Sequence, residues 1–142
     1  MKAQTDTHKF ILGQVTVRLL EESERARFDE LLEQKHYLES ARIGGRSVRY
    51  VAELNGEWIA LIAFSGAAPN LKAREEWIGW SHLQKARRLG FVVNNSRYLL
   101  LTERHSYPNL GSKVLSLCLK RLSRDWEQRW GQPVLVVESF VD

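Results

Sequence analysis

Two runs of strand-forming residues joined by Asn55-Gly56 are the feature that most constrains the fold. Along residues 47–54 successive side chains would point to opposite faces of a strand, and one face, with Val48, Tyr50, Ala52 and Leu54, is apolar. Residues 57–64 follow directly after the Asn-Gly pair. An Asn-Gly pair between such runs is typical of a two-residue hairpin, because both residues tolerate positive φ angles. The second run is almost continuously apolar, as in a central strand covered on both faces. The sequence therefore predicts a sheet with helices on both sides.

The residues before the hairpin predict a strand and a helix. Residues 14–20 alternate well enough for a first strand. Ser23 is the expected N-cap of an amphipathic helix over residues 24–35, whose outer side is acidic. The Gly44-Gly45 loop that follows suits either a binding loop or a simple connector, and the connector is the simpler interpretation.

The residues after the hairpin predict short elements. A helical turn is expected over residues 74–80, and Ser81 with Gln84 matches a capping box for a brief helix through Arg88. Residues 91–101 indicate a strand interrupted at Asn94-Asn95-Ser96. That interruption predicts either a bulge or a loop between two short strands.

The last part of the chain predicts a core helix and a final strand. Apolar residues at spacings of three and four give a wide apolar face over residues 110–122. Ser123 and Asp125 suggest that a new helical turn starts there, and Gly131 should end it. Residues 134–141 predict a buried strand. The expected fold class is α/β (α+β), with a mixed central sheet of about five to six strands flanked by helices.

Composition indicates one domain over residues 1–142, with residues 1–12 as a flexible leader. The chain has 142 residues and 44% apolar content, enough for a core. Its single cysteine, Cys118, lies in the apolar stripe of the core helix and is interpreted as structural; a lone cysteine also points to a reducing compartment. No signal peptide and no membrane-spanning run are recognisable, so we expect a cytoplasmic protein with no membrane partner.

The positive charge is concentrated in part of the chain. The net charge is +4, but residues 82–113 alone carry six Lys or Arg against one acid. This asymmetry predicts one basic face suited to nucleic-acid phosphates, although ordinary solvated faces would give the same count. The candidate nucleic-acid-binding residues are Arg46, Arg49, Lys85, Arg87, Arg88, Arg97, Arg104 and Lys113.

A turn before the core helix has the shape of an anion cradle. Asn109 can cap the helix, and Gly111 and Ser112 are small, so side chains leave the backbone of its first turn accessible. Backbone N–H groups at a helix N-terminus can face an anion. The predicted cradle consists of Asn109, Leu110, Gly111 and Ser112.

The predicted order of elements resembles the Gcn5-related N-acetyltransferase fold. In that family a splayed strand precedes a pyrophosphate-binding turn with the pattern Arg/Gln-x-x-Gly-x-Gly/Ala. Gly111 matches the last position, whereas Asn109 and Ser106 stand in place of the first glycine and of the Arg or Gln. The resemblance implies a truncated acetyltransferase-like fold. Because two key positions differ, acetyl-CoA is not the favoured ligand and no cofactor is expected.

A second resemblance covers nearly the whole chain. The segments that carry it are residues 17–20, 28–34, 36–38, 45–52, 77–81, 86–89, Val92-Val93-Asn94-Asn95-Ser96-Arg97-Tyr98-Leu99, and Glu138-Ser139-Phe140-Val141-Asp142. Together and in this order they resemble the DruA family of the Druantia anti-phage system, which also occurs beside or fused to transposase genes. The resemblance implies a bacterial protein of phage defence or mobile-element biology, with other defence-system or transposase components as partners. Family members usually continue further, so the chain is either a short member or the first part of one.

Glu138 and Asp142 are the best acid/base or metal-binding candidates. Glu138 is flanked by apolar residues, and a buried carboxylate needs a partner or a raised pKa. Arg97 is a candidate partner, and a structural ion pair is the simpler interpretation. His36, His82 and His105 lack metal-ligand spacing, so no metal is assigned.

Trp77 and Trp80 next to Lys85, Arg87 and Arg88 are compatible with stacking on nucleic-acid bases. Since the two tryptophans are three residues apart, inward packing on one helical face is the simpler interpretation. Two function classes stay open. The chain is either a recognition module that contacts nucleic acid through a basic face, which we favour, or an acyl-CoA-dependent N-acyltransferase. Whether it is an enzyme is left undecided.

Overall fold

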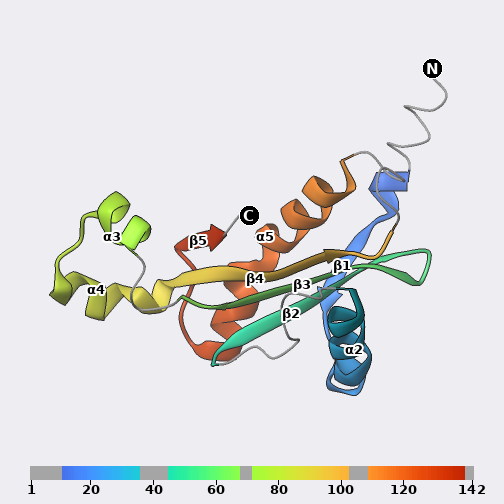
Figure 1. The fold of residues 1–142 in the computed structure, drawn as a ribbon, viewed down its shortest axis with the longest axis horizontal. Helices are drawn as coiled ribbons and strands as arrows, with labels where there is room; N and C mark the ends of the chain where they lie inside the picture. The colour runs from blue at the N-terminus through green and yellow to red at the C-terminus, as the bar shows by residue number, and fades with distance from the viewer. Residues whose placement is uncertain (1–10, 36–44, 68–71, 103–108, 140–142) are drawn as a thin grey trace.

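The computed structural model describes residues 11–35, 45–67, 72–102 and 109–139, which form a five-stranded sheet flanked by helices. The strands follow each other in space as they do in sequence, from β1 to β5. The first three pairings are antiparallel, and β4 and β5 are parallel. Figure 1 shows α2 and α5 flanking the sheet, with α3 and α4 at one end. The predicted mixed α+β fold is confirmed.

The hairpin at the centre of the sheet forms as predicted. β2 (Ser47–Leu54) and β3 (Glu57–Gly66) are joined at Asn55 and Gly56, whose φ angles are 54° and 81°. β3 is hydrogen-bonded to β2 on one side and to β4 (Val92–Leu100) on the other. Its side chains from Ile59 to Ser65 are buried, which confirms a central strand covered on both faces.

Two hydrophobic clusters fill the two faces of the sheet. On one face Tyr50 and Phe64 pack edge to face, with ring centroids 6.1 Å apart, in the cluster that contains Trp126 of α5 (Leu110–Trp130). On the other face Phe28 and Leu32 of α2 (Arg25–Lys35) belong to the cluster that contains Val51, Leu61 and Ala63. Alternation along β2 and β3 therefore sends neighbouring residues into different cores.

The start of α2 differs from the prediction at Ser23. β1 (Thr16–Leu19) is followed by the short 3-10 helix η1 (Glu22–Glu24), which leads directly into α2. The backbone N–H of Glu21 donates to Glu24 Oε1 at 3.0 Å, so Glu21 precedes the first helical turn and Ser23 lies within it. The assignment of Ser23 as the N-cap is wrong.

Three elements link β3 to β4. These are α3 (Lys72–Ile78), α4 (His82–Arg88) and the 3-10 helix η2 (Leu89–Phe91). The capping box of α4 is confirmed: Gln84 N–H donates to Ser81 Oγ at 3.1 Å, and Ser81 N–H donates back to Gln84 Oε1 at 2.9 Å. We call α3 and α4 together the helical arm.

β4 is one strand with a bulge. Its register with β3 passes from Ala63 opposite Arg97 to Phe64 opposite Asn95, so Ser96 is the extra residue. Ser96 Oγ donates to the carbonyl of Ala63 at 3.3 Å. The bulge interpretation of Asn94-Asn95-Ser96 is thereby confirmed, and two separate strands joined by a loop are excluded.

The C-terminal part corrects two predictions. α5 runs without interruption to Trp130 and ends at Gly131, so no new helix starts at Ser123. β5 (Val136–Ser139) is half-exposed, with Val137 39% accessible, so the buried strand expected over residues 134–141 is wrong for its described part; residues 140 and 141 lie outside the described residues. In the described parts of the chain, no helix is long and apolar enough to cross a membrane.

Candidate functional site

A cleft lies where the helical arm meets β4 and the segment before β5. It has a volume of about 400 Å³ and a largely apolar wall. The lining residues are Trp77, Ile78, Trp80, Arg88, Phe91, Val92, Leu135 and Val136. Trp77 is 82% exposed and Leu135 is 70% exposed. The inward packing predicted for Trp77 is therefore wrong, because α3 stands away from both hydrophobic cores.

The charged groups of the helical arm are arranged around Glu75. Lys85 Nζ lies 2.8 Å from Glu75 Oε1, and Trp80 Nε1–H donates to the same carboxylate. The Lys85 ammonium lowers the pKa of Glu75, and the Trp80 hydrogen bond adds to this. Arg88 is exposed at the cleft. The side chain of Arg87 lies outside the described residues.

Glu138 is held by an arginine from the helical arm. Arg74 Nε and Nη2 donate to its two carboxylate oxygens at 2.8 and 3.1 Å, and the Arg74 side chain is only 3% exposed. The hydrogen bond to Glu138 raises the pKa of Arg74. The partner of Glu138 is thus Arg74, and the expectation of Arg97 is wrong. Asp142 lies outside the described residues, so a joint role with Glu138 stays a prediction.

The turn before α5 has a conformation that the sequence only partly indicated. Asn109 is the N-cap residue of α5, as expected, with a φ of 65°, and its carbonyl accepts from Lys113 N–H at 3.0 Å. Its side chain makes no capping hydrogen bond, so the expected side-chain cap is wrong. Leu110 is buried, and the carbonyl of Gly111 accepts a hydrogen bond from Tyr98 Oη at 2.5 Å. Ser112 is exposed. Anion binding at this turn stays a prediction.

The predicted basic residues do not form a single face. Arg49 and Arg97 flank Ala63 in the register, on the side of the sheet covered by α2. Arg46 lies 5.7 Å from the ring centroid of Trp126 and donates to Gln132 Oε1 at 3.3 Å. Lys85 and Arg88 are in the helical arm, and Lys113 is in the first turns of α5. Arg104 lies outside the described residues.

The described residues were compared with the patterns of a metal-ligand cluster and of a reactive thiol. No group of three or more potential metal ligands occurs within the described ranges. Cys118 is fully buried in the α5 core, and burial raises the pKa of its thiol to about 12. Its interpretation as a structural residue is confirmed.

Comparison with protein families shows to which family the chain belongs. The family described as Druantia protein DruA matches residues 2–142. The chain belongs to the DruA family. No curated protein matches it. Membership of the DruA family supports a role in anti-phage defence.

Comparison with a solved structure shows that this DruA-family chain has an acetyltransferase-like fold. A ribosomal-protein-alanine N-acetyltransferase from Brucella melitensis biovar Abortus is similar with a TM-score of 0.51 and 10% identity, over 89% of this chain and 80% of that one. An acetyltransferase from Trypanosoma brucei has a TM-score of 0.47 and 16% identity, over 90% and 83% of the two chains. The acetyltransferase-like fold expected for the chain is confirmed.

Proposed function

We propose that this DruA-family protein acts in anti-phage defence as a recognition module that contacts nucleic acid. The observation that carries the proposal is the exposed ring of Trp77 beside Arg88 in the cleft of the helical arm. A large aromatic side chain that is four-fifths exposed contributes little to the stability of its own fold. Stacking on a nucleobase would remove this surface from water, and a nearby guanidinium would meet the phosphate.

Single-stranded nucleic acid fits this cleft better than a duplex does. The bases of a single strand are available for stacking, and their flat faces match an apolar wall with aromatic residues. Trp77, Trp80 and Phe91 supply the aromatic residues of the wall, and Arg88 supplies the charge. Residues 72–88 carry five Lys or Arg against two Glu, which favours approach of a polyanion.

Fluorescence anisotropy with a labelled single strand tests the stacking contact. Trp77→Ala should weaken binding about tenfold, since one base stack contributes roughly 1–3 kcal/mol. Leu83→Ala is the matched control, because Leu83 is also exposed in the helical arm but does not line the cleft. Equal affinity of wild type and Trp77→Ala would contradict the proposal.

The electrostatic contact is tested in the same assay. Arg88→Glu should weaken binding and reduce its dependence on salt, because a phosphate contact releases counterions. Arg124→Glu, a change of an exposed arginine in α5, should leave both quantities unaltered. If single- and double-stranded DNA fail to bind at low salt, the nucleic-acid proposal is refuted.

An acyl-CoA-dependent N-acyltransferase is the second candidate. As far as Ser139, the last residue described, β5 pairs with β4 from Val136 opposite Val92 to Ser139 opposite Asn95, directly before the bulge at Ser96. Within the described residues, the remainder of β4 pairs with β3 alone, so its other edge offers backbone groups to an extended ligand. Calorimetric titration with acetyl-CoA tests this candidate, and a dissociation constant weaker than about 1 mM would dismiss it.

A further inference from the structure

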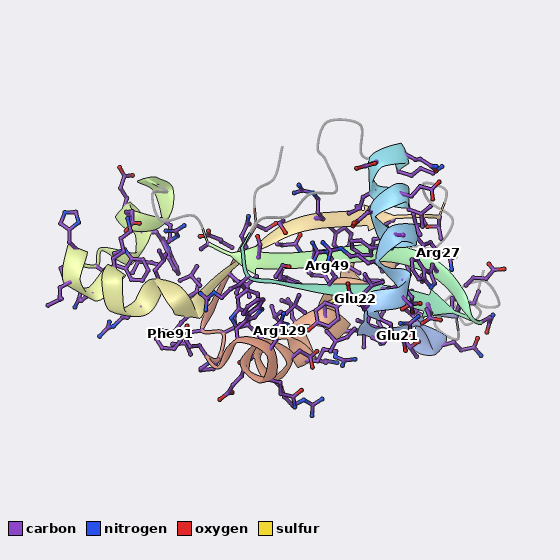
Figure 2. The ribbon with its side chains drawn as sticks, turned by 90° about the horizontal axis from the view of Figure 1, so that it is seen from below. Glu21, Glu22, Arg27, Arg49, Phe91 and Arg129 are labelled. Atoms are coloured by element: carbon purple, nitrogen blue, oxygen red, sulfur yellow. The ribbon has the colours of Figure 1, made fainter. Side chains whose placement is uncertain are left out.

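A second cavity lies where β1 ends and β2 begins, beside the C-terminal turn of α5. It has a volume of about 400 Å³, and three arginines from three elements line it: Arg25 of α2, Arg49 of β2 and Arg129 of α5. Figure 2 shows Arg49 on the sheet beside α2, with Glu22 and Arg129 nearby in the same view. Leu19, Leu20 and Val48 complete the wall with apolar surface.

Arg49 is the least satisfied of these cations. Its Nη1 donates to the neutral hydroxyl of Ser47 at 2.9 Å, while Nε and Nη2 are buried without a hydrogen-bond partner. Burial lowers the pKa of Arg49, and the like charges of Arg25 and Arg97 act in the same direction. Leaving charged N–H groups buried and unpaired is costly, and an anionic partner would remove that cost.

Two carboxylates near Arg49 already have partners. Asp125, which lines the cavity, accepts hydrogen bonds from Tyr50 Oη at 2.7 Å and Arg121 Nε at 2.6 Å. Asp29, which favours the charged form of Arg49, forms an ion pair with Arg25, with Oδ2 3.3 Å from Nε, while its Oδ1 is buried without a hydrogen-bond partner. Glu21 and Glu22 are exposed side chains of the wall. None of these acids accepts a hydrogen bond from Arg49 within the described residues.

We propose that this cavity binds a small organic anion through a phosphate or carboxylate group, with Arg49 as its main contact. The planar guanidinium can offer two parallel N–H groups to either oxyanion. Because Nε and Nη2 are inaccessible, the guanidinium has to turn toward the cavity that it lines when the anion binds. Arg25 and Arg129 add positive charge at the wall, and the volume leaves room for a body larger than the oxyanion itself.

Thermal unfolding in the presence of sodium phosphate, AMP or citrate tests the proposal. Each is compared with sodium chloride at the same ionic strength. At a tenfold excess over its dissociation constant, a ligand should raise the Tm of the wild type by roughly 5 °C. Stabilisation by phosphate and AMP but not citrate would assign a phosphate ligand, and the reverse would assign a carboxylate. If no anion stabilises the wild type beyond chloride, the proposal is overturned.

Variants locate the effect. In Arg49→Gln the stabilisation should disappear, whereas Arg124→Gln, on the exposed side of α5, should keep it. Equal stabilisation of Arg49→Gln and wild type would mean non-specific anion binding and would overturn the proposal. If Arg49→Gln does not fold, Arg129→Gln is the second variant, because this arginine is exposed. It should lower the affinity for the anion at least threefold, and an unchanged affinity would overturn the proposal. The assay is independent of nucleic-acid binding by the helical arm.

Discussion

At the scale of single residues, the best-defined polar network joins β2 to α5. Asp125 is 4% exposed, and its carboxylate accepts hydrogen bonds from Tyr50 and Arg121. Arg121 also donates to the carbonyl of Val17 at 2.9 Å, so the network reaches β1. Burial and the hydrogen bond to Asp125 raise the pKa of Tyr50, which keeps its hydroxyl a donor.

Asp125→Ala should lower the free energy of unfolding by about 3 kcal/mol, because it leaves the Tyr50 hydroxyl and the Arg121 guanidinium without their shared acceptor. Tyr50→Phe should cost less, about 1 kcal/mol, since the carboxylate keeps Arg121. Urea denaturation measures both. Glu127→Ala, an exposed change in the same helix, is the control and should be nearly neutral. A neutral Asp125→Ala would show that the network adds no stability.

The sequence did not reveal these residue pairs, for a physical reason. Tyr50 and Asp125 are 75 residues apart, and Arg74 and Glu138 are 64 apart. Neither spacing follows from local propensity. Asp125 instead suggested a helix start, since aspartate favours N-caps, whereas here its tertiary partners satisfy it inside the helix.

At the scale of elements, turns and helix ends were predicted correctly where the backbone conformation itself requires particular residue types. Asn55-Gly56 predicted the hairpin, Ser81 with Gln84 predicted the start of α4, and Gly131 predicted the end of α5. Each depends on neighbouring residues only. The exposure of Trp77 could not be predicted in this way, because it depends on where α3 stands relative to the sheet.

The end of α5 gives a prediction at this scale. Gly131 has a φ of 81°, and its N–H donates to the carbonyl of Glu127 at 2.8 Å. Gly131→Ala should cost about 1 kcal/mol of stability, because alanine is strained in the left-handed region. Gly13→Ala is the matched control, since Gly13 lies in a short helical segment with open space around it. Equal Tm values for the two variants would contradict this account.

At the scale of the whole molecule, the layer arrangement could be predicted from one strand. The apolar run in β3 required cover on both faces, and α2 and α5 provide it. The distribution of charge could not be predicted in the same way. Because the cations lie close together in the sequence, a single basic face was predicted. In the structure they lie apart, since side chains alternate along the β strands and the helical arm lies at one end of the sheet.

The parallel pairing of β5 has a consequence for local unfolding of the sheet. In its described part, β5 is held to β4 through four residue pairs, and its side chains are half-exposed. β3 is paired along both edges and buried. Amide hydrogens of β5 should therefore exchange with deuterium through local fluctuations, more than tenfold faster than those of β3, which require global unfolding. Hydrogen exchange followed by mass spectrometry measures this order, and equal protection would mean that the sheet opens as one cooperative unit.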